Sequence, residues 1–424
     1  MKSRIKRSEG TARHLEIEMP KQAVENVFGQ VLEDIRKTAK IPGFRQGKAP
    51  LDIIQKKHYE SAMDEVKQRL IPQAYQQALE EHNVNPVSHP EISDVNIELS
   101  GGLTFRAKVD AYPEVNLRKY KGLKAHTRKF SVTDDELEEA LTRIRNMYAE
   151  FNGTDRPLQR GDFGICDVET FINGEVIARK RKNMWIEADK EASMLGMGEE
   201  LFGLKTGDKK DIEVTLPENY PDRKYAGKKA VFRVEVKETK EKKLPGIDDE
   251  LAKKMGKDSL AEARQGLRMQ LMKKKESNAR VDMKNQIMEQ LLKKHPFGLP
   301  ASIVSRQLKV LMEKAENELV QKGVDREAID AHKEKLRGQL LRDAENKVRL
   351  YFILDAIADR EKIEVTDEDM NDWLKSLADS YNQSFEDVKK YYQDQGLTGG
   401  LKEQLREEKT LDFLLREAVI VKMK

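Results

Sequence analysis

Residues 41–50, IPGFRQGKAP, have a composition that favours an exposed, turn-rich loop. Gly43 and Gly47 permit positive φ angles and let the backbone approach another surface closely. Pro42 and Pro50 fix their own φ angles and stiffen the two ends of the segment. We therefore expect a loop of restricted conformation that separates two regular elements.

The side chains of this loop are suited to recognition of another molecule. Phe44 offers a rigid apolar anchor, while Arg45 and Lys48 can bind phosphates or carboxylates. Four cations nearby in the sequence enlarge this basic footprint: Lys37, Lys40, Lys56 and Lys57. An ordinary turn between two helices explains the same ten residues equally well, so the loop alone leaves both interpretations open.

Motifs for metal sites, nucleotide sites and catalytic nucleophiles are missing from the sequence. The seven histidines show no HxxxH spacing, and a single cysteine, Cys166, can form neither an intrachain disulfide nor a thiolate metal site. The P-loop, the dinucleotide fingerprint and the G-x-S-x-G elbow are also absent. We expect no metal and no cofactor, and we expect Cys166 to be a buried, unreactive thiol.

The composition indicates several domains with much solvated surface. A chain of 424 residues is long enough for about two to four domains, and with 38% apolar against 36% charged residues it cannot form one large core. The net charge of +3 argues against a protein that binds nucleic acid through a global electric field. The basic stretch 271–280, LMKKKESNAR, has no aromatic residues for base stacking, so a solvated helix face is the simpler interpretation.

Residues 1–115 mix helical and strand periods and predict an α+β unit. Segments 20–38 and 50–81 are expected to be helices that the 41–50 loop connects. A strand is expected in GGLTFRAKVDAYP, where four alternating apolar residues would face a core: Leu103, Phe105, Ala107 and Val109.

The rest of the chain divides into three further parts. Residues 116–154 form a linker and an amphipathic helix that packs on the C-terminal part, and Thr133 with Glu136 makes a capping-box pattern at its start. Residues 155–240 alternate in short runs between glycines and predict a compact β-rich domain. Residues 241–424 are expected to be almost wholly helical, with a core-facing stripe at Leu350, Ile353, Leu354 and Ile357 and caps in TDED at 366–369 and SFED at 384–387.

The loop carries a resemblance to a known family. GFRQGKAP closely resembles the G-F-R-x-G-K-x-P loop of bacterial trigger factor, a ribosome-associated chaperone, and all six defined positions are present: Gly43, Phe44, Arg45, Gly47, Lys48 and Pro50. The order of segments along the chain is also similar to that family. The resemblance implies a multidomain α+β protein with an α+β ribosome-binding head, an FKBP-like β-rich insert and an elongated all-α chaperone domain with two arms.

The resemblance also implies partners. The six loop residues would contact a ribosomal protein and rRNA phosphates on the large ribosomal subunit, near the exit tunnel. Nascent and unfolded polypeptides would bind the helical domain through scattered apolar contacts, without ATP. A homodimer away from the ribosome is a further expectation, since such apolar surfaces tend to pair.

The insert departs from the family where its isomerase pocket should be. An FKBP-type domain would hold a proline ring in an aromatic-lined pocket that favours the twisted amide of the transition state. Here the aligned segment MLGMG at 194–198 places Met194 and Met197 in that lining, with Met197 at the aromatic floor, and a run of four cations occupies 179–182 where a pocket loop should lie. The other lining positions would be Val168, Ile177, Trp185 (with Met184 as the alternative wall), Tyr220 and Phe232. Because apolar bulk replaces aromatic rings, we expect the fold to persist and the isomerase activity to be weak or absent.

Taken together, these features favour a ribosome-docked chaperone. The alternatives are an enzyme that acts chiefly as a peptidyl-prolyl cis/trans isomerase and, less favoured, a dedicated RNA-binding protein. The sequence contains no apolar run of about eighteen residues and no apolar segment near its start, so we expect a soluble protein of the reducing bacterial cytoplasm with no membrane partner.

Overall fold

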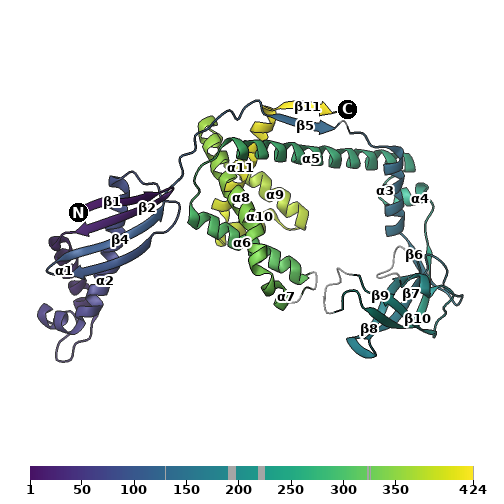
Figure 1. The fold of residues 1–424 in the computed structure, drawn as a ribbon, viewed down its shortest axis with the longest axis horizontal. Coiled ribbons are helices and arrows are strands. Elements are labelled where there is room, and N and C mark those ends of the chain that lie inside the picture. The colour runs from purple at the N-terminus through teal and green to yellow at the C-terminus, as the bar shows by residue number, and fades with distance from the viewer. Residues whose placement is uncertain (129, 190–196, 218–224, 322–323, 325, 424) are drawn as a thin grey trace. The chain divides into compact units, whose positions relative to one another are not determined.

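The computed structural model of the chain describes residues 1–128, 130–189, 197–217, 225–321, 324 and 326–423. These residues form two compact units, each assembled from separate stretches of the chain. The first unit contains 1–125, 284–314 and 334–419, and the second contains 126–283, 315–333 and 420–424. Both units combine helices and strands, as the sequence predicts (Figure 1).

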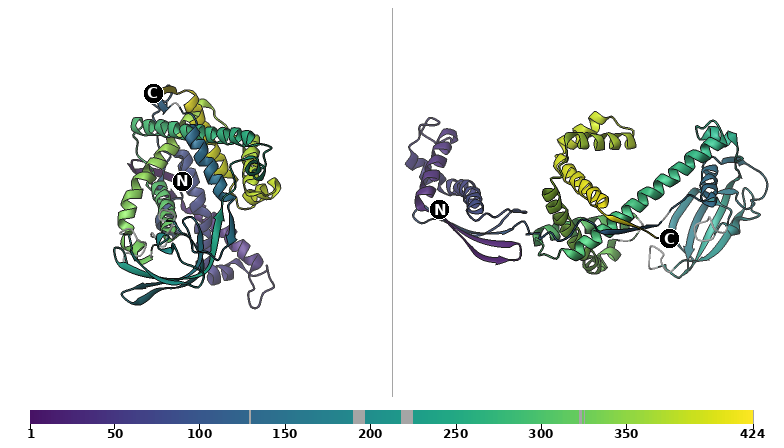
Figure 2. Two further views of the ribbon diagram at one scale, coloured as in Figure 1. Left: turned by 90° about the vertical axis from the view of Figure 1, so that its right-hand side faces the viewer. Right: turned by 90° about the horizontal axis from the view of Figure 1, so that it is seen from above.

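The N-terminal part is an antiparallel sheet in the order β1-β2-β4-β3 with two helices on one face (Figures 1 and 2). Its elements are β1 (Lys2–Glu9), β2 (Ala12–Met19), α1 (Lys21–Thr38), α2 (Leu51–Glu81), β3 (Glu91–Glu98) and β4 (Gly102–Asp110). The four alternating residues of β4 that were predicted to face a core are all buried. They pack with the apolar faces of α1 and α2, and the opposite face of the sheet stays open. We call this part, residues 1–111, the head.

The second unit contains an antiparallel sheet in the order β6-β10-β7-β8, with β9 paired to β10. Its elements are β6 (Glu150–Gly153), β7 (Phe163–Ile172), β8 (Glu175–Glu187), the 3-10 helix η2 (Glu199–Leu201), β9 (Lys209–Thr215) and β10 (Lys229–Lys243). The apolar residues of these strands form one core, in which Cys166 is fully buried. We call this sheet and its connections the insert.

Helix α3 (Asp134–Met147) begins at the predicted capping box, in which Thr133 and Glu136 each accept a backbone N–H of the other. Its buried face packs against Leu267 of α5 (Leu260–Lys294). The Lys275 ammonium adds an ion pair 2.6 Å from the Glu136 carboxylate. Helix α3, the helix expected within 116–154, therefore packs on α5 of the C-terminal part.

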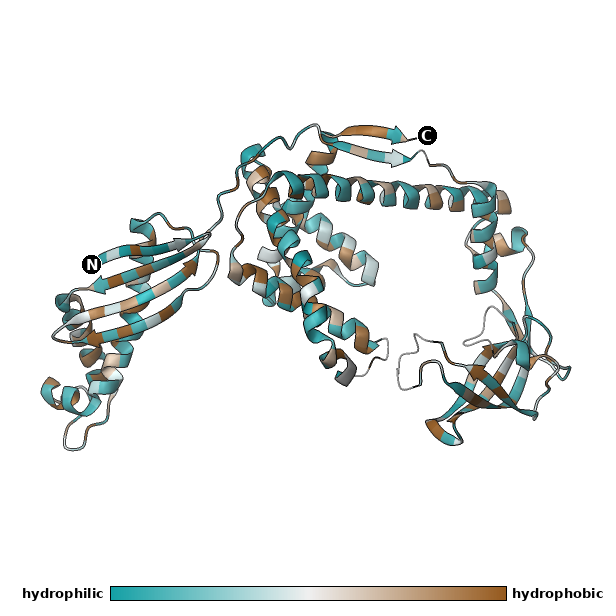
Figure 3. Ribbon diagram, viewed as in Figure 1, coloured by the Kyte–Doolittle hydropathy of each residue, from teal (hydrophilic) through white to brown (hydrophobic). Residues whose placement is uncertain are grey.

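The C-terminal part is mainly helical. Besides α5, which is largely hydrophilic (Figure 3), its elements are α4 (Asp249–Lys254), α6 (Ala301–Gln321), α7 (Arg326–Ala331), α8 (Lys333–Glu361), α9 (Asp367–Tyr381), α10 (Phe385–Asp394), α11 (Thr398–Arg416) and β11 (Val419–Met423). Thr366 caps α9 and Ser384 caps α10, as predicted. Of the predicted stripe on α8, Ile353, Leu354 and Ile357 are buried and Leu350 is partly buried.

Two boundaries differ from the sequence prediction because strand partners come from distant parts of the chain. The amphipathic helix expected within 116–154 ends at Met147, and residues Glu150–Gly153 form β6, which pairs with the end of β10. The expected all-helical C-terminus ends in β11, which pairs with β5 (Lys124–Arg128). Local periodicity carries no signal for either of these long-range pairings.

Candidate functional site

The loop 41–50 lies between α1 and α2 and is anchored at both ends. Ile41 and Ala49 are buried in the core of the head, so the segment between them projects from the head as a short loop. The Gln46 amide donates to the carbonyls of Lys37 and Thr38 at 3.2 and 3.3 Å, and this occupies acceptors left free at the end of α1. The loop is therefore tied to the helix that precedes it.

Two consecutive turns give the loop its shape. The Phe44 N–H donates to the Ile41 carbonyl at 3.1 Å, and the Lys48 N–H donates to the Arg45 carbonyl at 2.9 Å. Gly43 and Gly47 occupy the third position of each turn with φ angles of 85° and 80°. This is the backbone of type II turns, which require glycine or asparagine there.

The turns expose the three side chains that were predicted to recognise a partner. Phe44 is 42% exposed, a high fraction for an aromatic residue, and Arg45 and Lys48 are also exposed. Among the described residues, no carboxylate lies within ion-pair distance of either cation, whereas Lys37 pairs with Asp34 at 3.2 Å. An apolar ring and two uncompensated charges on a restrained backbone can bind a surface that combines an apolar hollow with phosphates or carboxylates.

The insert brings together most of the residues predicted to line an isomerase pocket. Val168, Met197 and Phe232 are buried in its core, and Ile177 packs against them. Met194 and Tyr220 lie outside the described residues. Four of the predicted lining residues thus belong to, or pack against, one apolar core: two β-branched side chains, one methionine and one phenylalanine.

Trp185 does not fit the predicted role of a pocket wall. It is 51% exposed and stacks on the outer face of the sheet with Phe151 and Phe163, at ring-centroid distances of 5.4 and 6.0 Å. Successive side chains of a strand point to opposite faces, so its neighbour Met184 faces the core instead. Met184 is therefore the better candidate for the wall position.

The cation run 179–182 is also placed differently from the prediction. It belongs to β8 and does not form a pocket loop. Lys180 forms ion pairs at 3.3 Å with both Asp167 and Glu235. Asp167, which is buried, was not predicted as a site residue. Its signal in the sequence is a carboxylate among the apolar residues of a strand.

The groups around Lys180 lower the pKa values of two carboxyl groups, those of Asp167 and Glu235. The backbone N–H of Asn183 and, secondarily, the Lys180 ammonium hold the pKa of Asp167 below its ordinary value. Hydrogen bonds from Lys237 and Lys180 lower the pKa of Glu235 to about 2. Both groups are thus fixed as anions at neutral pH and are poor candidates for acid–base chemistry.

The predicted burial of Cys166 is confirmed. Burial, followed by the nearby charge of Asp167, raises the pKa of the Cys166 thiol to about 12. Because the thiolate is the reactive form of cysteine, this shift accords with the prediction of an unreactive thiol. Among the residues that the structure describes, no cluster of three histidine, cysteine or carboxylate side chains could hold a metal ion. No helix in the described ranges is long and apolar enough to cross a membrane.

The comparisons with known proteins cover most of the chain. The model of "Bacterial trigger factor protein (TF)" matches residues 1–144, and that of its C-terminus matches 259–416. The model of the "FKBP-type peptidyl-prolyl cis-trans isomerase" matches 154–237, which coincides with the insert.

Relatives and one solved structure agree with these matches. The trigger factor of Halalkalibacterium halodurans is 31% identical, with 99% of this chain and 100% of the relative covered. That of Geobacillus thermodenitrificans is 33% identical, with 97% and 98% covered. A solved structure from work on substrate recognition by the trigger factor chaperone has the same fold, with a TM-score of 0.51, 21% identity, and 98% of this chain and 100% of that chain covered. The chain therefore belongs to the trigger factor family.

Proposed function

We propose that this protein docks on the large ribosomal subunit near the exit tunnel through the 41–50 loop and holds nascent polypeptides in a folding-competent state. The observation that carries the proposal is the loop itself. Two glycine turns fix its backbone and present Phe44, Arg45 and Lys48 without internal charge partners among the described residues. Its six motif residues match the family loop one by one.

The docking proposal is tested by co-sedimentation with purified ribosomes. Phe44→Ala with Arg45→Ala should reduce binding by at least tenfold, because an apolar anchor and a charge-assisted contact are both lost. The matched control replaces an exposed apolar residue and an exposed cation on the head sheet, Ile92→Ala with Lys108→Ala. Equal loss in both variants would contradict docking through the loop.

Client holding is supported by apolar side chains that both units leave exposed on their helices. They are Met269, Val281, Val310, Val320, Leu341, Tyr381 and Tyr391. Dispersed apolar contacts of this kind suit many different unfolded segments, since no single pocket dictates the bound sequence. The same surfaces would support a dimer of the free protein.

The second proposed activity concerns the insert, whose match to the FKBP-type family raises prolyl isomerisation as a function. We propose that this activity is weak or absent. Met197 takes the floor position with a flexible, non-aromatic chain, and Trp185 points away from the core. A loosely defined pocket offers less stabilisation to the twisted amide.

A short Xaa-Pro peptide tests this second proposal, because it is too small to be confused with a held client. The full chain should give isomerisation at or close to the uncatalysed rate. Acceleration that Phe232→Ala abolishes would show that the altered lining still forms a working pocket and would contradict the proposal.

A further inference from the structure

The first strand of the head is an exposed edge of its sheet. β1 pairs with β2 on one side only, and seven of its eight residues are exposed, Ser3 being partly buried. An edge strand leaves every second backbone N–H and C=O without a partner, which makes it a template for another extended chain. The regular run Lys2–Ile5 ends at a register shift between Ile5 and Arg7.

Cations occupy the open-face side of this edge. Lys2 and Arg4 lie opposite Glu18 and Glu16 of β2, whose neighbours Leu15 and Ile17 face the core. They therefore point to the sheet face that no helix covers. An added strand would place its own side chains directly beside Lys2 and Arg4 at cross-strand distance, closer than it would approach the carboxylates of β2.

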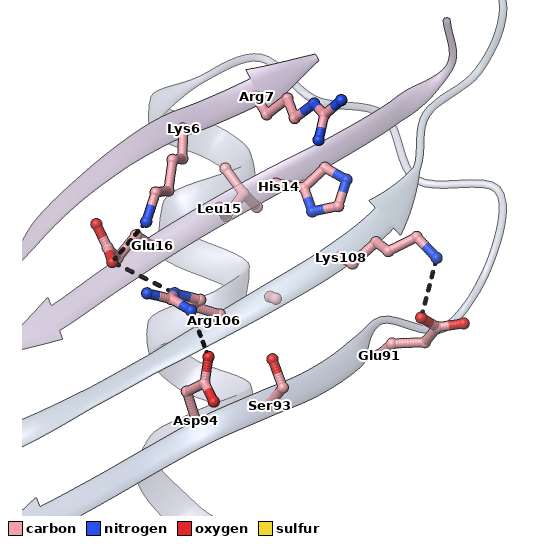
Figure 4. Close-up of a pocket in the computed structure, with 11 residues that line it drawn as sticks. Lys6, Arg7, His14, Leu15, Glu16, Glu91, Ser93, Asp94, Arg106 and Lys108 are labelled. Carbon is pink, nitrogen blue, oxygen red and sulfur yellow. Dashed lines mark hydrogen bonds and ion pairs between the residues drawn. The ribbon is translucent and has the colours of Figure 1, made fainter. Parts of the chain in front are cut away.

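The local carboxylates do not neutralise all the cations of β1. Glu16 pairs with Arg4 and, more loosely, with Lys6 at 3.8 Å, while Arg106 is held more closely by Asp94 than by Glu16 (Figure 4 shows the contacts of Glu16 with Lys6 and Arg106). The strand carries four cations, Lys2, Arg4, Lys6 and Arg7, whereas the carboxylates beside them are Glu9, Glu16 and Glu18. The hydrogen bond from Arg4 holds the pKa of Glu16 below its ordinary value, so the carboxylate is already fully charged. An excess of positive charge therefore remains along β1.

The opposite side of the same edge carries Ser3, whose hydroxyl donates to the Glu81 carboxylate, and one apolar residue, Ile5. Ile5 lies opposite Leu15, a core residue, and is 37% exposed. A strand added to β1 would place an apolar side chain beside Ile5 and acidic side chains beside Lys2 and Arg4. The edge thus matches an extended segment in which acidic and apolar residues alternate.

We propose that β1 binds such a segment by β-augmentation, as an additional strand of the head sheet. The proposal rests on the proposed chaperone function for the source of the segment, an unfolded client polypeptide. The same cations would repel the β1 strand of a second copy of the protein. The edge therefore favours an acidic strand over pairing with another β1. The other edge, β3, is less suited, because Asp94 at φ 50° interrupts its ladder between Ser93 and Asn96.

A small-molecule site on the open face of the sheet is less well supported, because charged side chains there are already paired with one another. A cleft of about 540 Å³ lies on it, but Arg106 pairs with Asp94 at 2.6 Å and Lys108 with Glu91 at 3.1 Å across its floor (Figure 4). RNA is also disfavoured, since these carboxylates repel phosphates and the lining of the cleft contains no phenylalanine, tyrosine or tryptophan for base stacking.

The test uses the full-length protein and a fluorescein-labelled peptide of three Glu-Val repeats, with three Lys-Val repeats as the charge control. Anisotropy should show binding of the acidic peptide alone, and hydrogen exchange should show slowed exchange of the backbone amides of β1. Lys2→Gln with Arg4→Gln should weaken binding about tenfold, as loss of two cross-strand charge pairs would. Lys108→Gln, on the same face but in the central strand β4, should leave binding unchanged.

An N-methylated acidic peptide separates strand addition from plain charge attraction. It keeps every carboxylate but cannot donate backbone hydrogen bonds, so it should not bind. Equal binding of this peptide, or binding without slowed exchange in β1, would overturn the proposal. So would an RNA oligomer that binds β1 where the acidic peptide does not.

Two further assays distinguish failure of the edge proposal from failure of the proposed function. They are ribosome co-sedimentation and suppression of client aggregation, both measured on the Lys2→Gln, Arg4→Gln variant. If both remain intact while the wild-type protein fails to bind the acidic peptide, only the edge proposal fails. If the wild-type protein binds neither ribosomes nor clients, the proposed function fails whatever the peptide does.

Discussion

At the scale of single residues, Met197 illustrates what one replacement in the insert is expected to change. Met197 is buried in the same core as Val168 and Phe232, so it preserves apolar volume there. A methionine does not provide a flat, rigid surface against which a proline ring could pack. Under the proposed function, the fold and the isomerase activity of the insert therefore depend on different properties of this side chain.

Met197→Phe should raise isomerisation of a short Xaa-Pro peptide by at least tenfold over the wild-type protein, because a rigid ring restores the floor. The assay uses the full chain, and Met184→Leu serves as a control that changes a neighbouring apolar residue without adding a ring. An unchanged rate in a folded Met197→Phe variant would show that the floor residue is not what limits the activity.

A second prediction at this scale concerns the pH dependence of stability. Hydrogen bonds from Lys409 and from Thr366 at the start of α9 lower the pKa of Asp369 from 3.8 to about 2. Because the folded pKa lies below the unfolded one, the ionised carboxylate stabilises the folded state at neutral pH. This stabilisation is lost as the pH falls through the interval between these two values.

Asp369→Asn should therefore lower the thermal midpoint of the helical part at pH 6, and the difference from wild type should shrink as the pH falls towards about 3. Asp367→Asn makes the same change of side chain in the same helical turn and is the matched control. A difference that stays constant with pH would contradict the assigned role of Asp369.

At the scale of elements, the sequence predicts those features that depend on neighbouring residues, such as helix caps and turns. The caps at Thr133, Thr366 and Ser384 were predictable because a cap depends on residues three positions apart. The loop 41–50 was predictable for a similar reason, since its glycines and prolines set the turns themselves. Its exposure followed from its position between two helices.

Features decided by distant partners could not be predicted in the same way. The strand β11 exists because β5, almost three hundred residues earlier, supplies its hydrogen-bond partner. The position of Trp185 depends on the phase of β8, which β-bulges alter between Cys166 and Phe171. Periodicity within one segment contains neither piece of information.

The turns of the loop support a prediction at the element scale. A Cβ at Gly47 would meet no atom within 4 Å, so Gly47→Ala tests backbone conformation alone. The φ angle of 80° should cost about 1 kcal/mol for alanine and weaken ribosome binding about fivefold, although Phe44 and Arg45 are unchanged. Gly338→Ala, at another open position but without a positive φ, should leave ribosome binding unaffected in the same sedimentation assay.

At the scale of the whole molecule, the surfaces proposed for docking and for holding clients belong to separate parts of the chain. The proposed docking residues belong to the head, whereas the exposed apolar side chains lie on the helices of both units. A double substitution in the loop should therefore remove localisation without removing the capacity to hold clients. This separation distinguishes a docked chaperone from a protein whose main role is isomerisation.

A denatured model client tests this separation. The Phe44→Ala, Arg45→Ala variant should suppress its aggregation as well as the wild-type protein does, and neither should respond to ATP or to enzymatic removal of ATP. A requirement for nucleotide, or loss of holding in the loop variant, would contradict the division of roles.

The most direct measurement of the central claim is photo-crosslinking from position 44. A photoreactive phenylalanine analogue in place of Phe44 should crosslink to a protein or to rRNA of the large ribosomal subunit when the variant is mixed with purified ribosomes. The same analogue in place of Phe151, which is exposed on the insert, should give no such product in the absence of a nascent chain. Absence of a large-subunit crosslink from position 44, with the variant folded and the analogue reactive, would contradict docking through this loop.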